Sequence, residues 1–159
     1  MTEKQYDIRA AMADDADAVR RCAEQAYAMY VARIGKKPAP MIADFAGQIA
    51  KGLVHVVECA GDVAGFIVHF ANDDHYFIEN VALRPEHQGH GLGRRLLRFA
   101  EAEAQRQGFG RVELYTNAAM TENLEFYPRL GYVEFERRHE AGFSRVYFRK
   151  ELAPIAPSH

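Results

Sequence analysis

The stretch Val81-Ala-Leu-Arg-Pro-Glu-His-Gln-Gly-His-Gly-Leu-Gly-Arg-Arg-Leu-Leu97 decides the fold of this chain. Its apolar start predicts the end of a β-strand that Pro85 stops, and the three glycines that follow predict a loop. An amphipathic helix comes directly after them and ends at Gly108, because apolar residues recur at helical spacing. The apolar stripe is Leu92, Leu96, Leu97, Ala100 and Ala104. A glycine loop that opens a helix suits a phosphate ligand, since the first helical N–H groups are unpaired and the helix dipole is positive there.

Positive charge is concentrated around this helix start. The 159 residues carry 22 acidic and 20 basic side chains, a net charge of −2. The segment from Arg84 to Arg111 holds six Arg and three Glu, so it is +3 and the remainder of the chain is −5. A net charge near zero offers no field for nucleic acid or an anionic membrane, and we expect neither as a partner. The local excess, with Arg94, Arg95 and Arg98 in the first turns of the helix, suits a small phosphorylated ligand.

Composition predicts an ordinary globular domain. Hydrophobic residues make up 48% and charged residues 26%, enough for one core over residues 4–152, with a loose tail at 153–159. Cys22 and Cys59 are too few and too far apart for a disulfide framework or a metal site, so we expect no metal. A polar N-terminal sequence and short apolar runs indicate neither a signal peptide nor a membrane span, so a cytoplasmic location is expected.

Hydrophobic periodicity predicts a mixed α/β (α+β) domain built around a meander. The predicted helices are one capped by Asp14 or Asp15 and running to about Arg33, 42–51, the helix from Leu92 to Gly108, and 121–130. The predicted strands are 6–11, 53–59, 63–70, 75–83, 112–115, 132–138 and 143–150.

Three phosphate-binding motifs can be compared with the glycine loop. A P-loop requires Gly-Lys-Ser/Thr, and Gly93 is followed here by Arg-Arg-Leu, which excludes it. A dinucleotide fold requires G-x-G-x-x-G after the first strand; the spacing here is G-x-G-x-G after four strands, although Glu113 lies where a ribose-binding acid could sit. A glycine-rich turn without a ligand is the structural alternative. The third motif is the coenzyme A loop.

Two motifs resemble those of the GCN5-related N-acetyltransferase (GNAT) family. Gln88-x-x-Gly91-x-Gly93 is similar to the family's Gln/Arg-x-x-Gly-x-Gly/Ala signature, and Leu114–Asn117 with Asn123–Tyr132 resembles its second acetyl-CoA segment. The element order fits from Tyr6 to about Leu152. The resemblance implies a mixed, largely antiparallel twisted sheet of about seven strands flanked by four helices, and acetyl-CoA as the cofactor.

The resemblance also assigns cofactor-binding residues. It implies that the strand backbone pairs with the pantetheine arm, that the loop amides bind the pyrophosphate, and that three residues near the second motif contact the cofactor. A bulge that splays the strand is typical of the family, and the polar pair Glu79-Asn80 is where one could occur. In that order the residues are Val81, Ala82 and Leu83; Gln88, Gly89, His90, Gly91, Leu92, Gly93 and Arg94; and Asn117, Asn123 and Phe126.

The same resemblance supplies two candidate catalytic residues. Glu79, between Phe77 and Val81 on one strand face, is the candidate base that takes a proton from the acceptor ammonium. Tyr127 is the candidate acid for the leaving thiolate. The alternatives are a structural ion pair for Glu79 and core packing for Tyr127. Pro128 follows Tyr127 directly and cannot donate a backbone hydrogen bond, so we expect the helix to be short or distorted there. Such a distortion would change the direction of the Tyr127 side chain.

The acceptor is expected at the segment joining the first two helices, which is where the family builds its pocket. Tyr27, Tyr30, Arg33 and Asp44 offer aromatic walls and one charge of each sign; the alternative is core packing and solvated charges. The final hairpin, Arg137–Glu140, is a candidate to close the pocket or to form a homodimer contact. We expect direct transfer of an acetyl group to a primary amine of a small molecule. The alternatives are a protein N-terminus or lysine as acceptor, or a non-catalytic acyl-CoA-binding sensor.

Overall fold

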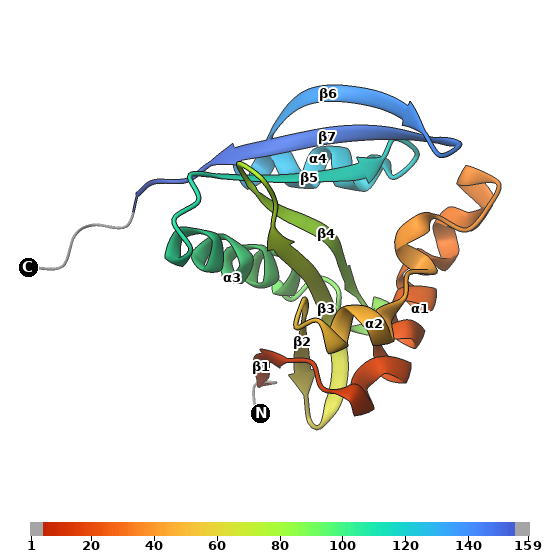
Figure 1. Ribbon diagram of the computed structural model, residues 1–159. Helices are drawn as coiled ribbons and strands as arrows, with labels where there is room; N and C mark the ends of the chain where they lie inside the picture. Colours follow the sequence, from red (N-terminus) through yellow and green to blue (C-terminus); the bar gives the residue numbers. More distant parts are fainter. Residues whose placement is uncertain (1–4, 155–159) are drawn as a thin grey trace, which may run out of the picture. The chain divides into compact units, whose positions relative to one another are not determined.

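The computed structural model describes residues 5–154; Lys4 and residues 155–159 of the predicted tail lie outside the described part. Among the described residues the chain forms seven strands and four α-helices, joined in places by short 3-10 turns. The strands make one sheet in the order β1-β2-β3-β4-β5-β7-β6 (Figure 1). β4 and β5 are parallel, whereas the pairs β1–β2, β2–β3, β5–β7 and β6–β7 are antiparallel. The mixed, largely antiparallel sheet predicted from the sequence is therefore confirmed.

The chain divides into two compact units, which are described separately. The first consists of Met1–His69 and Asn80–Leu97, and the second of Phe70–Glu79 and Arg98–His159. The first contains β1 (Tyr6–Ala10), α1 (Ala16–Ile34), α2 (Phe45–Ala50) and β2 (Val54–Cys59). The second contains β5 (Arg111–Asn117), α4 (Thr121–Arg129), β6 (Val133–Glu140) and β7 (Phe143–Glu151). Three elements contribute to both units: β3 (Asp62–Ala71), β4 (Tyr76–Leu83) and α3 (Leu92–Arg106).

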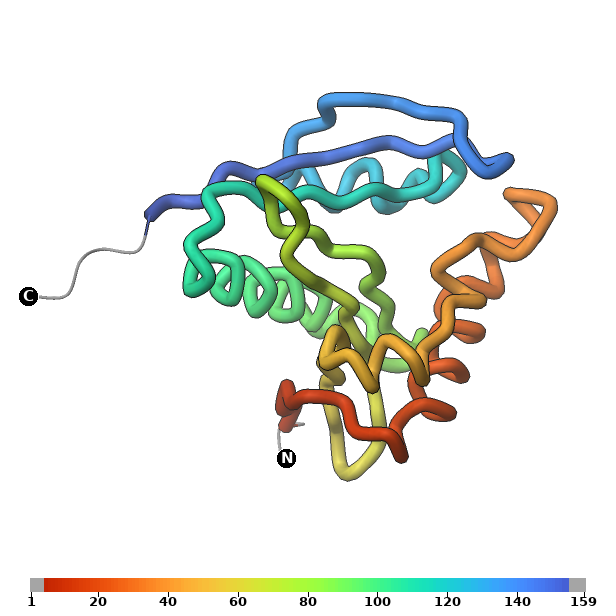
Figure 2. Tube along the Cα trace, viewed as in Figure 1, coloured from red at the N-terminus to blue at the C-terminus, as the bar shows by residue number. Residues whose placement is uncertain are grey.

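Tight turns set the two hairpins that the sequence predicts. Ala60 and Gly61 have φ values of 52° and 86°, and Ala141 and Gly142 have 51° and 78°. Two consecutive residues with positive φ give a turn whose twist matches that of antiparallel strands. The turn between β2 and β3 is the yellow loop in Figure 2.

One helix cap and one helix start differ from the prediction. The side chain of Asp15 does not cap α1; it accepts from the Met12 amide at 2.7 Å and pairs with Arg9 at 2.7 Å. The second helix was predicted from residue 42 but begins at Phe45, because Asp44 caps it by accepting from the Gly47 amide at 3.1 Å. The preceding residues Ala39–Met41 form a 3-10 turn instead.

The apolar stripe of α3 is buried as predicted. Leu92, Leu96 and Leu97 line the part of the helix in the first unit, and Ala100 and Ala104 the part in the second; none is more than 1% exposed. In the second unit, α4 lies along β5 and β7 (Figure 1), and Tyr127 of α4 contacts Phe148 of β7. The helix faces are thus fixed by the spacing of apolar residues.

Candidate functional site

The loop Gln88–Arg94, called the phosphate loop below, connects the end of β4 to α3 in the first unit. Gly89 and Gly91 adopt φ values of 84° and 75°, a region in which a side chain is strained. A Cβ atom built on either glycine would meet nothing within 4 Å, so there is room above the backbone. The intrahelical bonds begin with the Arg95 amide, which donates to Gly91 at 3.1 Å. The open backbone, the unpaired amides of the first turn and the exposed Arg94 fit a pyrophosphate group.

The phosphate loop is held by β1. The hydroxyl of Tyr6 lies 3.2 Å from Nδ1 of His87, just before the loop, and its ring contacts His90 at 6.1 Å between centroids. Arg95 donates to the Tyr6 carbonyl oxygen at 3.1 Å. Gln88 donates from its amide nitrogen to the Leu83 carbonyl at 3.4 Å. The two histidines are thus ordered by contacts with Tyr6, which no pattern in the sequence predicts.

The predicted pantetheine strand, Val81–Leu83, is closely approached by β3. At Gly65 a Cβ atom would lie 2.6 Å from the Ala82 carbonyl oxygen and would also clash with the Leu83 side chain. Only glycine fits this contact without displacing β4. Gly65 therefore allows the close contact between β3 and β4, and an isolated glycine inside a predicted strand was the signal that could have identified this contact.

The acceptor segment is tied to β4 through Tyr27. The Tyr27 hydroxyl donates to Oδ1 of Asn80 at 2.7 Å and lies 3.3 Å from the Val81 carbonyl oxygen. Asn80 in turn donates from Nδ2 to the Pro40 carbonyl oxygen at 2.9 Å. Both side chains are buried, Tyr27 at 8% and Asn80 at 4% exposure. Tyr27, predicted as a substrate residue, thus connects α1 and the segment after it to the strand.

The other predicted acceptor residues lie nearer the surface. The guanidinium of Arg33 is 5.1 Å from the centre of the Tyr30 ring, so these two form a cation–π pair on α1. Asp44 is exposed, and its carboxylate caps α2. The structure therefore brings Tyr30 and Arg33 together and gives Asp44 a local structural role.

Glu79 lies on the half-buried face of β4 in the second unit. Buried and half-buried residues alternate from Tyr76 to Leu83, so Glu79 and Asn80 point to opposite faces. Asn72 bonds to His75 and Arg84 bonds to Ala64, so the register between β3 and β4 shifts by one residue, as a bulge in β4 would produce. The parallel ladder with β5 joins Tyr76, Phe77 and Ile78 to Val112, Glu113 and Leu114. Glu79 is the next residue after this ladder.

The turn between β5 and α4 is built by two asparagines. Oδ1 of Asn117 accepts from the Ala119 amide at 2.9 Å, which forms an Asx turn. Asn123 donates from Nδ2 to the hydroxyl of Thr116 at 3.0 Å. These bonds involve Oδ1 of Asn117 and Nδ2 of Asn123, and they fix the geometry of the second motif.

Tyr127 is buried at 5% exposure within an aromatic cluster. Its ring lies 5.4 to 5.9 Å from the rings of Phe126, Tyr132 and Phe148. Pro128 sits in the last turn of α4, and the Tyr127 carbonyl oxygen accepts from the amides of Leu130 and Tyr132 at 3.0 and 3.1 Å. The helix therefore continues past Tyr127 before it ends, and the ring is fixed by packing.

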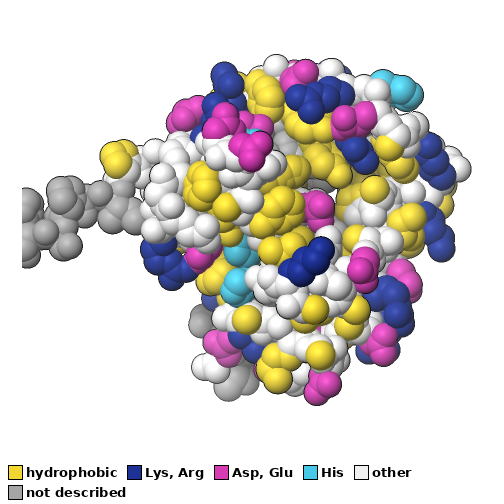
Figure 3. Space-filling view, viewed as in Figure 1, with side chains coloured by type: hydrophobic (Ala, Val, Ile, Leu, Met, Phe, Trp, Pro, Cys, Tyr) yellow, Lys and Arg dark blue, Asp and Glu magenta, His cyan; other side chains and the backbone are white. Residues whose placement is uncertain are grey.

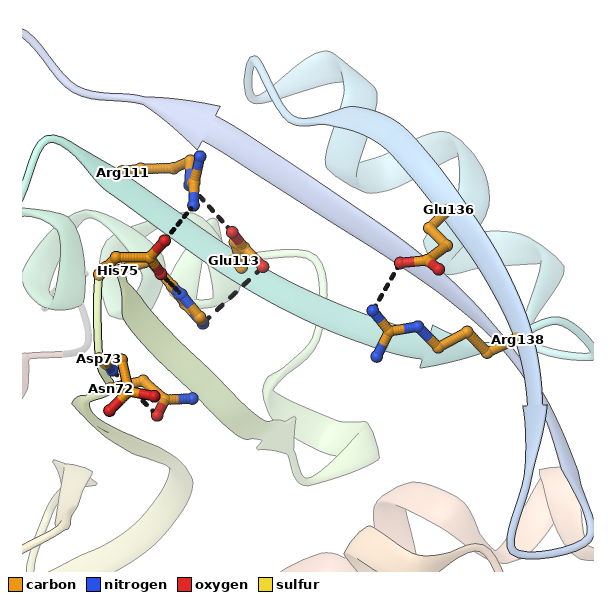
Figure 4. A network of polar contacts seen from close by, with 8 residues as sticks. Asn72, Asp73, His75, Arg111, Glu113, Glu136 and Arg138 are labelled. Carbon is orange, nitrogen blue, oxygen red and sulfur yellow. Dashed lines mark hydrogen bonds and ion pairs between the residues drawn. The ribbon is translucent and has the colours of Figure 1, made fainter.

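Glu113 belongs to an ion-pair network in the second unit (Figure 4). Arg111 pairs with Glu113 at 2.9 Å and with Asp74 at 3.4 Å, and His75 lies between the two carboxylates. A Glu113 carboxylate engaged in this way fills the structural role of an ion pair. This observation weighs against the ribose-binding role that a dinucleotide fold would require.

Charged side chains are interspersed on the part of the surface formed by β6 and β7, at the top of Figure 3. Arg137 pairs with Glu134 at 2.8 Å and Arg138 with Glu136 at 2.5 Å. Within residues 5–154, no group of three or more His, Cys, Asp and Glu side chains could hold a metal ion. No α-helix in that range is long and apolar enough to cross a membrane.

The sequence profile of the Acetyltransferase (GNAT) family matches residues 16–132, more than half of the chain. The chain belongs to this family. The match contains the phosphate loop and the second motif, so the resemblance seen in the sequence is confirmed. The room above Gly89 and Gly91 fits the pyrophosphate of coenzyme A.

Comparison with individual proteins supports the same fold. The chain is 32% identical over 74 residues to streptothricin acetyltransferase from Streptomyces lavendulae, a match that covers 45% of this chain and only 39% of that relative. The structure is similar to PaiA N-acetyltransferase from Thermoplasma acidophilum in complex with coenzyme A, with a TM-score of 0.75, 15% identity, and coverage of 92% and 99% of the two chains. It is also similar to the ribosomal-protein-S18-alanine N-acetyltransferase from Escherichia coli, with a TM-score of 0.73, 18% identity, and coverage of 98% and 100%. At these identities the two structures show a shared GNAT fold.

Proposed function

We propose that this protein is an acetyl-CoA-dependent N-acetyltransferase that acts on a primary amine. The observation that carries the proposal is the phosphate loop: two glycines with positive φ open a 15-residue helix beside Arg94, within a chain of the GNAT family. The backbone of Val81, Ala82 and Leu83 would hold the pantetheine arm, and Asn117, Asn123 and Phe126 would contact the cofactor from the second motif. Acetyl-CoA supplies an activated thioester.

Two residues would move protons in this reaction. An ammonium group with a pKa of about 10 must lose a proton before it can attack a carbonyl carbon, and Glu79 is proposed to accept that proton, directly or through water. The thiolate that leaves gains stability from a proton, which Tyr127 is proposed to donate. The aromatic rings around Tyr127 hold its side chain in one orientation.

The properties of Cys22 favour direct transfer over an acetylated cysteine. Cys22 is fully buried, and burial raises the pKa of its thiol to about 12. A thiol that stays protonated and out of contact with solvent is a poor nucleophile. We therefore propose that the amine attacks the thioester while both substrates are bound.

A small molecule is the proposed acceptor. The relative from Streptomyces lavendulae, to which part of this chain is similar, is named for streptothricin, a small molecule. A protein N-terminus is the second candidate, because the similar structure from Escherichia coli is named for an alanine of a ribosomal protein. The cytoplasmic location and the homodimer contact of the final hairpin stay predictions.

A screen for acetyl transfer tests this function. Purified protein should release free coenzyme A from acetyl-CoA when offered the correct amine among amino acids, polyamines, aminoglycosides, streptothricin-type antibiotics and N-terminal peptides. Glu79→Gln and Tyr127→Phe should each lower kcat by roughly 10²-fold while acetyl-CoA still binds. Unchanged rates in both variants at saturating substrate would reject the catalytic assignment, and binding without turnover on the whole panel would favour a sensor.

A further inference from the structure

Five aromatic side chains form a row across the second unit on the face that carries Glu79. They come one from each of β3, β4, β5, β7 and β6, and neighbouring ring centroids are 5.4 to 6.1 Å apart. Side chains alternate along a strand, so residues 77 and 79 of β4 share this face with residue 115 of β5. The row is Phe70, Phe77, Tyr115, Tyr147 and Phe135.

Tyr115 follows the ladder on β5, as Glu79 follows it on β4. The ladder pairs Phe77 with Glu113 and ends at Ile78 and Leu114, so Glu79 and Tyr115 are the next residues of their strands. The rings of Phe77 and Tyr115 are in T-shaped contact at 6.0 Å, and Phe77 lies two residues before Glu79 on the same face of β4. Tyr115 therefore lies on the face that carries Glu79.

Arg145 holds the Tyr115 ring from β7. Its guanidinium carbon lies 4.5 Å from the centre of the Tyr115 ring and 5.6 Å from that of Phe143. Only 14% of the Arg145 side chain is exposed, and Nη1 donates to Glu140 at 3.2 Å. A stacked guanidinium fixed by a carboxylate limits rotation of the ring beneath it.

Glu140 is itself held by two donors. The Tyr147 hydroxyl donates to the same Oε1 atom that accepts from Arg145. These hydrogen bonds keep the pKa of Glu140 below its usual value, so the carboxylate stays ionised and the Arg145 contact persists. Tyr147, Glu140, Arg145 and Tyr115 thus form one chain of contacts that leads to Glu79.

The hydroxyl of Tyr115 is kept in its protonated form. Burial raises the pKa of Tyr115 above its usual value, and the nearby carboxylates of Glu79 and Glu140 act in the same direction, while Arg145 opposes them. A neutral phenol beside a carboxylate donates a hydrogen bond and does not lose its proton.

We propose that Tyr115 is a positioning residue for Glu79: its hydroxyl donates a hydrogen bond to the Glu79 carboxylate, directly or through one bound water, while Arg145 and Glu140 hold its ring. This inference rests on the proposed function, in which Glu79 is the base. Tyr115 changes its protonation state at no step; it limits the orientations of the carboxylate, so that one oxygen faces the amine.

Two substitutions separate this role from packing. Tyr115→Phe keeps the ring and removes only the hydroxyl, whereas Tyr115→Leu removes both. Loss of a hydrogen bond to a charged group corresponds to roughly 10- to 100-fold in rate, so both variants should lose that factor in kcat, with KM for acetyl-CoA within about twofold of wild type. Only Tyr115→Leu should lower the melting temperature. Tyr76→Phe, on the opposite face of β4, is the matched control and should keep the wild-type kcat.

A double-mutant cycle with Glu79→Gln completes the test. If Tyr115 acts through Glu79, Tyr115→Phe has no further effect in the Glu79→Gln background. Wild-type kcat in Tyr115→Phe, or an additive loss in the double variant, would overturn the inference. The proposed function fails separately, by the absence of turnover in the wild-type protein with every amine.

Discussion

Two histidines on neighbouring strands of the first unit face each other inside the fold. Nδ1 of His55 on β2 lies 2.9 Å from Nε2 of His69 on β3. His69 is 4% exposed, and burial lowers its pKa to about 4, with the adjacent His55 contributing in the same direction. A shared hydrogen bond between two imidazoles requires one donor and one acceptor, so the pair is satisfied when both rings are neutral.

This pair predicts a loss of stability in mild acid. In the unfolded chain His69 takes up a proton near pH 6.5, whereas in the folded protein it does so only near pH 4. The neutral His69 therefore contributes its full stabilisation above pH 6.5 and loses it as the pH falls toward 4. The free energy of unfolding should fall by about 2 kcal/mol between pH 7 and pH 5. Urea unfolding at the two pH values measures this, and His69→Gln should remove most of the difference.

An exposed histidine provides the control for that measurement. His139 lies on β6 at the surface and contacts Ser144 at 3.2 Å. His139→Gln should leave the difference between pH 7 and pH 5 as in the wild-type protein. An equal flattening in both variants would contradict the assignment to His69.

At the scale of the element, the close contact between β3 and β4 requires a glycine at residue 65. A methyl group at residue 65 would press on the Ala82 carbonyl oxygen at 2.6 Å, and a backbone atom cannot move aside as a flexible side chain can. Gly65→Ala should therefore destabilise the protein by about 1–3 kcal/mol and displace the proposed pantetheine strand. Urea unfolding together with the Kd for coenzyme A checks both effects. Gly110→Ala, where a Cβ atom would meet nothing within 4 Å, is the control; a wild-type Kd in Gly65→Ala would contradict the link to the cofactor.

Most elements could be predicted from the sequence because their signals are local. The apolar stripe from Leu92 to Ala104 repeats at helical spacing, and α3 lies where it indicates. Asp44 is a typical helix cap, but the apolar Ile42 before it extended the predicted helix backwards. Local patterns thus predict which helices and strands form, whereas the exact residue at which a helix begins is predicted less well.

Of the candidate site, the sequence predicts the residues that belong to the two motifs but not the long-range contacts around them. Asn117, Asn123 and Tyr127 lie within a short segment, and the resemblance located them. The bond from Tyr27 to Asn80 joins residues 53 apart, and the contact of Tyr6 with His87 joins residues 81 apart. Contacts over such separations depend on how strands and helices pack, which periodicity does not report.

At the scale of the whole molecule, positive charge is concentrated around the proposed phosphate-binding segment. Val81–Leu83 and the phosphate loop both belong to the first unit. The segment with a charge of +3 contains the loop, while the rest of the chain carries −5. A ligand with phosphate groups is therefore expected to bind the phosphate loop and to stabilise the folded protein.

A thermal shift measures that stabilisation. Coenzyme A at 100 times its Kd adds about 2.7 kcal/mol, which corresponds to a rise in Tm of roughly 5–10 °C for a chain of this size. NADH at the same concentration should give no comparable shift, because Glu113 is committed to Arg111. Gly91→Ala should lose most of the rise, since φ of 75° strains alanine and moves the loop amides. Gly35→Ala, with φ of 84° at the end of α1 and equally open space, is the matched control: it should lower the starting Tm by a similar amount and keep the full response to coenzyme A. Equal responses in the two glycine variants, or a larger shift with NADH, would refute the assignment of the phosphate loop.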